Sequence, residues 1–452
     1  LIVGDVIYAS QSEENPESNS MGMLAAIKGN GVGDVTQSLA IWKTRGAMIG
    51  RATPVMVDGK LVAVDDGAGY YVYNPDTGKQ LYSKKLGTAQ RASPLYADGK
   101  IYTVDMNGRW NVLKPKPDGS VDVIHRLRLP GECHSSPIVS HGRIYVQSLD
   151  TLFCIAKKGA TPAADPIPAP PVEPKAADDA EPATVLVVPA EALVRPGEKI
   201  AFEARVYDAA GRRLKDRPAV FSVKGNGAAE SNGQFTAGAK PHSAAMVTAT
   251  VGGLKAEARV RVIPDLPWSF DFADGEIPVT WVGMRYRHVI RKNGDDPFMV
   301  KITTIPKGQR SQAWIGHPDF HDYTMQAEFK GARTNDKLPD MGLIAQRYTF
   351  DLMGQAQQLQ IRTWTASTRR AVANVPFKWK EGVWYVMKFR AANEGPKAVL
   401  RGKVWPKGET EPEAWNLELA DDAPNRNGSP GFYGNAQNSE ISIDNVKVFA
   451  NQ

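Results

Sequence analysis

The 452-residue sequence has only two cysteines, no long apolar run and no block of like charges. Two cysteines, Cys133 and Cys154, cannot make a disulfide framework, so we expect either one bridge between them or two buried thiols. A stretch of about 18 apolar residues is absent, which excludes a membrane-spanning helix. The 55 basic and 49 acidic side chains are dispersed, and their net charge of +6 does not favour nucleic-acid binding.

A secretion signal is also absent. The first residues, "LIVGDVIYAS", have the pattern of a buried strand and do not begin with Met. We therefore expect the sequence to start inside a longer precursor. A chain of this length is expected to form about two to four domains.

A seven-residue pattern occurs three times, as "PVMVDGK", "PLYADGK" and "PIVSHGR". In each copy a small residue and a proline precede an apolar run, a tight turn and a second apolar run. The turn is Asp58-Gly59, Asp98-Gly99 or His141-Gly142, and an Asp-Gly pair between alternating segments predicts a β-hairpin. Short antiparallel strands that recur every 40 to 43 residues are typical of propeller blades.

The second copy, "TPVMVDGKLVAVDDGAGYYVYNPDTGKQLY", resembles the quinoprotein-like (PQQ-like) β-propeller repeat, and the resemblance covers residues 1–157. An earlier, divergent copy has Trp42 in the place of Tyr82 and an insertion, "QSEENPESNS", which we interpret as a surface loop. The copies make about four blades, whereas the family closes with about seven or eight. The missing blades are therefore expected upstream or on another polypeptide.

The resemblance does not extend to a quinone site. Quinone-dependent dehydrogenases of this family need an acidic base, calcium ligands, a vicinal cysteine pair and a stacking tryptophan. The chain has no adjacent cysteines and no matching set of acid and Asn ligands. We therefore assign no PQQ cofactor to it, as for the many family members that serve as scaffolds.

Two further segments follow the repeats. Residues 158–183 are rich in proline and alanine, which predicts an extended spacer. Residues 184–264 contain short alternating runs that predict a small β-sandwich. Within them, "RPGEKIAFEARVYDAAGRRL" and "GQFTAG" resemble bacterial Ig-like domains, which usually act as spacers between other domains.

Residues 265–452 hold eight of the ten tryptophans and no helical period of useful length. The pieces "DYTMQAEFK", "MGLIAQRY" and "GVWYVMKFRA" resemble concanavalin A-like jelly rolls, including laminin-G-like domains and the sugar-directed domains grouped with keto-disaccharide hydrolases. The predicted fold class of the chain is therefore all-β: a partial β-propeller, an Ig-like sandwich and a jelly roll.

One strand of the expected jelly roll has the composition of a sugar-binding face. In "QLQIRTW", Gln358, Gln360, Arg362 and Trp364 project to one side of the strand, where amide, guanidinium and aromatic groups together suit a glycan. Arg347 joins them if the two strands are neighbours. The alternative is a solvated outer face with Trp364 packed at an edge. The other tryptophans, such as Trp384, are expected in the core.

Catalytic and metal sites have weaker signals in this segment. A glycosidase needs two carboxylates at a fixed separation, and the Glu-x-Asp-x-x-Glu motif of jelly-roll glucanases is absent. Asp271 and Asp444, in the first and last strands, are candidates for a structural calcium site, the alternative being ordinary solvent-facing residues. His317 and His321 are four residues apart, but Pro318 argues against a helix and hence against a metal pair.

The sequence thus favours a non-catalytic bacterial scaffold in the periplasm, at the cell surface or secreted. The propeller would bind a protein partner, and the jelly roll a cell-surface glycan. The alternative class is an enzyme, either a PQQ-type quinoprotein oxidoreductase or a jelly-roll sugar hydrolase. A structural calcium ion is the one cofactor that the residues suggest.

Overall fold

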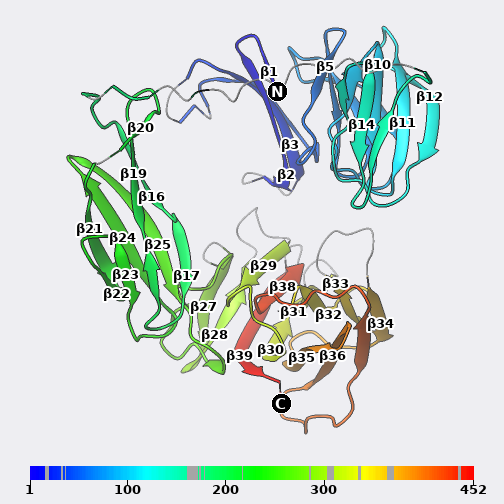
Figure 1. The fold of residues 1–452 in the computed structure, drawn as a ribbon. Helices are drawn as coiled ribbons and strands as arrows, with labels where there is room; N and C mark the ends of the chain where they lie inside the picture. The colour runs from blue at the N-terminus through cyan, green and yellow to red at the C-terminus, as the bar shows by residue number, and fades with distance from the viewer. Residues whose placement is uncertain are drawn as a thin grey trace. The chain divides into compact units, whose positions relative to one another are not determined.

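The computed structural model describes residues 1–15, 20–31, 34–35, 37–159, 172, 175–177, 179–215, 217–284, 287–302, 310–333, 337–363, 371–435 and 439–451. Every regular element in these ranges is a β-strand, which confirms the predicted all-β fold class (Figure 1). Accordingly, no helix in the described part of the chain is long and apolar enough to cross a membrane. The chain divides into two compact units within the proline-rich stretch.

The first unit consists of antiparallel sheets in which consecutive strands pair in chain order. Three of these sheets have four strands, and the last has three, as expected from the repeats. Their strands are β1 (Ile2–Val3), β2 (Val6–Glu14), β3 (Met21–Lys28) and β4 (Ala40–Arg45); β5 (Val55–Val57), β6 (Lys60–Val64), β7 (Gly69–Tyr73) and β8 (Gln80–Lys85); β9 (Leu95–Ala97), β10 (Lys100–Val104), β11 (Arg109–Pro115) and β12 (Val121–Arg128); and β13 (Ile138–Ser140), β14 (Arg143–Gln147) and β15 (Leu152–Ile155).

The three predicted turns join the first two strands of their sheets. Both central residues have positive φ in each turn, with 46° and 73° at Asp58-Gly59, 49° and 63° at Asp98-Gly99, and 49° and 71° at His141-Gly142. Strand β5 pairs with β6 from Val57 opposite Lys60, so the loop has two residues. This is the type of turn whose twist matches that of the strands, and the hairpin prediction is confirmed.

The small residue before each proline joins one sheet to the next. The backbone N–H of Thr53 donates to Ser93 Oγ at 2.9 Å, and that of Ser93 donates to Ser136 Oγ at 2.8 Å. Trp42 forms a second joint, since its Nε1 donates to the carbonyl oxygen of Pro75 in the following sheet at 2.8 Å. The repeated pattern therefore carries hydrogen bonds between blades as well as the turn within each blade.

The structure of this unit differs from two local predictions, one for the insertion and one for the cysteines. The insertion "QSEENPESNS" is not a loop from its first residue, because strand β2 continues through Glu14. Asn15 then lies buried, and its Nδ2 donates to the carbonyl oxygens of Ser20 and Gly22 at 2.7 and 2.9 Å. Both cysteines are free thiols, with Cys133 buried and Cys154 exposed, so neither a bridge nor two buried thiols is found.

The second unit begins with a small sandwich over residues 184–262. One sheet has the order β17-β25-β24-β21, and two three-stranded sheets, β16-β19-β20 and β18-β23-β22, complete it. Phe202 and Phe235 meet edge to face in its core, with ring centroids 6.1 Å apart. Its strands are β16 (Thr184–Val188), β17 (Glu191–Val194), β18 (Lys199–Ala201), β19 (Glu203–Tyr207), β20 (Arg213–Leu214), β21 (Val220–Gly225), β22 (Gly227–Ala229), β23 (Gln234–Ala237), β24 (Ser243–Val251) and β25 (Leu254–Val262).

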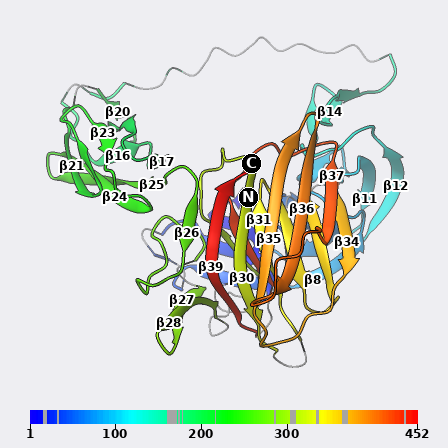
Figure 2. The same cartoon turned by 90° about the horizontal axis from the view of Figure 1, so that it is seen from below.

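A large sandwich follows, with two sheets packed face to face. The eight-stranded sheet has the order β27-β28-β39-β30-β35-β36-β37, with β26 also paired to β39, and Figure 2 shows its central strands side by side. The six-stranded sheet has the order β29-β38-β31-β32-β33-β34. The strands are β26 (Trp268–Phe270), β27 (His288–Asn293), β28 (Asp296–Lys301), β29 (Arg310–Trp314), β30 (Tyr323–Gly331), β31 (Asp340–Ala345), β32 (Tyr348–Met353), β33 (Gln358–Thr363), β34 (Val372–Pro376), β35 (Tyr385–Glu394), β36 (Lys397–Pro406), β37 (Leu417–Asp421), β38 (Gly431–Asn435) and β39 (Ile441–Ala450).

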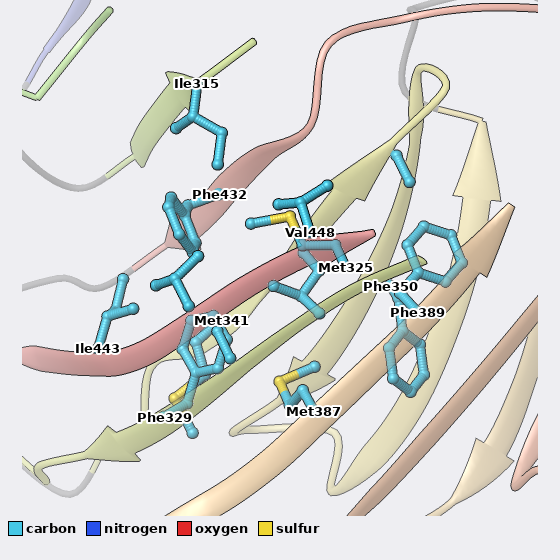
Figure 3. Packing of buried hydrophobic residues seen from close by; sticks show 14 of the residues in the cluster. Ile315, Met325, Phe329, Met341, Phe350, Met387, Phe389, Phe432, Ile443 and Val448 are labelled. Carbon is cyan, nitrogen blue, oxygen red and sulfur yellow. The ribbon is translucent and has the colours of Figure 1, made fainter. Parts of the chain in front are cut away.

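The core of the large sandwich lies between these two sheets (Figure 3). Phe350 of the six-stranded sheet stacks on Phe389 of the eight-stranded sheet, with ring centroids 5.6 Å apart. Met325, Phe329 and Met387 from the eight-stranded sheet fill the space beside them and are fully buried. Because side chains alternate along a strand, burial of this inner face turns the residues between them to the outer faces.

Residues of the small sandwich contact residues of the large one, and we call this contact region the seam. Arg195, at the end of β17, donates from Nε to Asp265 Oδ1 at 2.7 Å and from Nη2 to Asp319 Oδ2 at 3.2 Å. The imidazole of His242 packs edge to face against Trp268 and Phe270, with centroids 5.1 and 4.8 Å apart. Ionic and aromatic contacts therefore hold the small sandwich against the first strand of the large one.

Candidate functional site

Strand β33 presents the predicted polar residues on the outer face of the six-stranded sheet. Leu359 and Ile361 are fully buried in the core, whereas Gln358, Gln360 and Arg362 between them are partly exposed. The amides are linked through Asn374 on β34, whose Oδ1 accepts from Gln360 Nε2 at 2.7 Å. The structure thus brings three of the five predicted ligand residues together.

The register of the sheet adds residues that the sequence did not indicate. Along one row across the strands, Tyr433 on β38 lies opposite Gly342 on β31, and Gly342 lies opposite Asp351 on β32. Asp351 in turn lies opposite Gln360, which lies opposite Asn374. One polar row therefore crosses the sheet from an aromatic ring, past a glycine, to a carboxylate and two amides.

Asp351 is the most buried polar residue of this row, at 2% exposure. Its Oδ2 accepts from Arg362 Nε at 3.0 Å and from Thr349 Oγ1 at 3.1 Å. Its Oδ1 has no hydrogen-bond partner among the described residues. Burial raises the pKa of Asp351 to about 6, against the attraction of Arg362.

Arg362 reaches across the sheet above Gly342. Its guanidinium lies over the ring of Tyr433, 5.3 Å from the centroid, although the two residues are on strands separated by β31 and β32. A Cβ on Gly342 would come within 2.9 Å of Asp351 Oδ1, so a side chain there would crowd this arrangement. Held by Asp351 at one edge and by Tyr433 beneath, the guanidinium is fixed in place before any ligand arrives.

Of the other two predicted ligand residues, only Arg347 can be placed. Arg347 has a φ of 63° and lies in the turn between β31 and β32, where its Nε donates to the carbonyl oxygen of Asn427 at 3.2 Å. Although β31, β32 and β33 are neighbours, Arg347 lies in the turn and does not join the other predicted ligand residues. Trp364 lies outside the described residues.

The predicted calcium ligands have separate surroundings. Asp271 is exposed after β26 and accepts a hydrogen bond from the N–H of Ala273 at 3.1 Å. Asp444 on β39 is 2% exposed rather than solvent-facing, and burial raises its pKa to about 6. The described residues contain no group of three or more His, Cys, Asp and Glu that would hold a metal ion, and the calcium site stays a prediction.

Two side chains on the outer side of the eight-stranded sheet, those of Trp384 and Glu411, have contacts that the sequence did not predict. Trp384 is only partly buried, and it meets Phe298 at 5.8 Å and Lys330 Nζ at 4.8 Å on the outer side rather than in the core. Glu411 is exposed in its loop and pairs with Lys388 and Lys403 at 2.8 and 2.7 Å. The loop therefore closes over part of this sheet.

The sequence carried a signal for Asp351 that we did not use. In "YTFDLMG", Asp351 alternates with Phe350 and Leu352, so a strand with those residues in the core places the carboxylate on the other face. Tyr433 had no such signal. It belongs to the face only because β38, far along the chain, pairs with β31.

Comparison with known proteins identifies the repeat region. Residues 32–122 match the protein family described as outer membrane protein assembly factor BamB, which confirms a PQQ-like propeller repeat over this range. No curated protein matches the chain significantly.

Solved structures similar to this chain fall into two groups. BamB from Moraxella catarrhalis has 16% identity, a TM-score of 0.26 and covers 34% of this chain and 40% of its own, so less than half of that protein is matched. The carbohydrate-binding module CBM66 from Bacillus subtilis has 12% identity and a TM-score of 0.24, over 38% of this chain and 92% of its own. A structure from work on endo-acting O-glycanases of the human gut microbiota has 7% identity and a TM-score of 0.29, over 41% and 99%. At these TM-scores none of the three assigns an activity or a residue role.

Proposed function

We propose that the protein is a non-catalytic interaction protein whose large sandwich binds a glycan on the outer face of its six-stranded sheet. The observation that carries this proposal is the row of Gln360, Asp351 and Tyr433 with Arg362 fixed above it. Amide groups supply both donors and acceptors, and a guanidinium supplies donors only. Sugar hydroxyls both donate and accept, so they match this set.

Pre-organisation supports the same assignment. Arg362 is held by Asp351 and Tyr433, and Gln360 is held by Asn374 at 2.7 Å, so binding would immobilise few additional side chains. Ordering a flexible side chain on binding costs about 0.5–1.5 kcal/mol, and a rigid face avoids much of that cost. The inner face of the same strands is apolar core, which keeps the polar row fixed from below.

The propeller repeats would supply the second contact, with a protein partner. The matching family is described as an assembly factor for outer membrane proteins, which supports a role as a binding platform in the bacterial periplasm or at the cell surface. The Ig-like module and the proline-rich stretch would then act as spacers between the two binding parts. Domain limits at residues 157, 183 and 264 remain part of this proposal.

A glycan array with the intact chain tests the glycan-binding face. Gln360→Ala should weaken binding by about tenfold, because it removes two hydrogen-bonding groups from the centre of the row. Gln326→Ala is the matched control, since Gln326 is also a partly buried amide but faces outward from the eight-stranded sheet. Equal binding by both variants, or no binding by the unaltered chain, would contradict the proposal.

A sugar hydrolase is the second candidate. It is favoured by Asp340 and Asp351 on the same face, because burial raises the pKa of both carboxyl groups. A raised pKa lets a carboxylic acid stay protonated near neutral pH and act as a general acid. Release of reducing ends from a bound glycan, lost in Asp351→Asn but not in Gln326→Ala, would replace the non-catalytic proposal with this one.

A further inference from the structure

Three arginines lie together on one side of the third sheet of the propeller unit. Arg109 on β11 is directly opposite Arg128 on β12, and two residues along the same pair of strands Asn111 is opposite Arg126. Since side chains two residues apart share a face, all four side chains lie on one side of this hairpin. The three arginines are exposed, whereas Asn111 is 1% exposed.

Neutral groups, rather than carboxylates, hold the three guanidinium groups in place. Arg126 Nε donates to Asn111 Oδ1 at 2.7 Å, and Arg128 Nε donates to the carbonyl oxygen of Asn107 at 3.1 Å. Arg109 donates from Nη1 to the carbonyl oxygen of Leu86 at 3.3 Å. No acidic side chain in the described part of the chain forms an ion pair with any of them, in contrast to Arg51, which pairs with Asp66.

The support beneath Arg126 is itself built from buried polar groups. Asn111 Nδ2 donates to Thr103 Oγ1 at 3.3 Å, and both residues are almost fully buried. This contact orients the amide so that its oxygen faces Arg126. The amide would be costly to bury without hydrogen bonds, and here its oxygen is satisfied by the guanidinium, which is thereby held in one position.

Like charges opposite each other on two strands destabilise a sheet, and here a third arginine adds to the repulsion. The cluster surrounds a surface depression of about 370 Å³, lined by Asn107, Arg109, Arg126, Leu127 and Arg128. A group with two or more anionic oxygens placed in this depression would remove the repulsion. Arginine also presents a planar fork of donors that fits such oxygens in pairs.

We propose that this arginine cluster binds a phosphate or sulfate group, either as the free oxyanion or as the ester headgroup of a lipid. The proposal is independent of the glycan-binding face, which lies in the other unit. Each guanidinium retains N–H donors beyond the one that anchors it, since a guanidinium has five. Three guanidinium groups, each held by one hydrogen bond, therefore surround one depression. They provide the positive charge and the oriented N–H donors that a tetrahedral oxyanion requires.

The test measures binding of inorganic phosphate to the intact chain by calorimetry, with Arg126→Gln, Arg128→Gln and a control, Lys79→Gln. Lys79 is an exposed cation of the same unit, so its loss changes the net charge equally. We expect saturable binding that each arginine variant weakens by about tenfold or more and that the control leaves within about twofold. Binding should also fall as sodium chloride is raised.

A second arm identifies the source of the anion. Vesicles of phosphatidylcholine with and without phosphatidylglycerol are sedimented with each protein. Retention only on the anionic vesicles, lost in Arg126→Gln, supports the lipid headgroup, and phosphate binding without retention supports the free oxyanion. Binding to neither probe, or equal binding by Arg126→Gln and Lys79→Gln, overturns the proposal. The thermal midpoint of unfolding of each variant, measured without phosphate, verifies folding. Arg126→Lys is a further variant, which keeps the positive charge but loses the planar set of guanidinium N–H donors.

Discussion

Asp351 combines two properties at a single residue, since it orders Arg362 and yet is held in surroundings that disfavour its charge. Its pKa is raised by burial to about 6, above the value of about 4 expected in the unfolded chain. The folded state therefore binds a proton more tightly than the unfolded state does. The stability contributed by this group is full below about pH 4 and is lost as the pH rises through 6.

Replacement of Asp351 by Asn removes this titration. The free energy of unfolding of Asp351→Asn, relative to the unaltered chain, should rise by about 2 to 3 kcal/mol between pH 4 and pH 7, because two units of pKa correspond to that energy. Urea unfolding at the two pH values measures it. Gln326→Ala, which replaces a non-titrating side chain on the outer face of the eight-stranded sheet, is the control and should show no such trend. A difference that does not change with pH would show that Asp351 has the same pKa in the folded and unfolded states.

The polar residues of strand β33 were within reach of sequence reasoning, and their surroundings were not. Gln358, Gln360 and Arg362 were found because alternation along one strand is a local pattern. The contact of Arg362 with Tyr433 depends on β38 pairing with β31, and the intervening sequence does not specify that pairing. Arg109 and Arg128 show the same limit, since charges that look dispersed along the sequence meet when two strands pair.

At the scale of the element, the hairpin turns are the best-predicted part of the molecule. Asp58-Gly59 defines its own conformation, because two residues at positive φ close the hairpin and few other residue pairs tolerate it. The strand ends that follow from the turn agree with the quoted runs, such as "KLVAV" at β6. The first part of the insertion, residues 11–15, was mispredicted because its polar composition hid both the continuation of β2 and the buried side-chain bonds of Asn15.

Gly59→Ala tests the importance of the turn conformation. Gly59 has a φ of 73° and no atom near enough to clash with a Cβ, so the substitution changes only the backbone preference. A left-handed alanine costs about 1–2 kcal/mol, and the unfolding free energy of the propeller unit should fall by that amount. The matched control is Gly253→Ala, which is equally open but has no positive φ. Equal effects in calorimetric unfolding would show that the turn does not require glycine.

At the scale of the molecule, we expect the seam between the two sandwiches to be sensitive to acid. Burial lowers the pKa of His242 to about 4 and also lowers that of His317. His242 faces Trp268 and Phe270, and His317 lies near Asp319, Arg195, Glu198 and Asp265. Because the folded-state pKa is depressed, the stabilisation is present above about pH 6.5 and is lost as the pH falls towards 4.

His242→Phe keeps an aromatic ring at this position but removes the imidazole nitrogen that titrates. We expect the two sandwiches of the unaltered chain to separate between about pH 6 and pH 4, and the variant to separate at lower pH. Small-angle scattering of the second unit across this range follows the change as an increase in the radius of gyration. Arg195→Ala serves as a comparison, since it should weaken the seam at every pH. Identical profiles for His242→Phe and the unaltered chain would assign the acid response elsewhere.

The hydrogen bonds made by the small residue before each blade proline have one more consequence. Ser93 accepts from the sheet before it through Oγ and donates to the sheet after it through its own N–H. Each joint therefore uses the same two atoms, whichever neighbours it connects. Duplication of the repeat that contains Ser93 would therefore create another joint of the same chemistry, so the chain could gain a blade without a new kind of contact between blades.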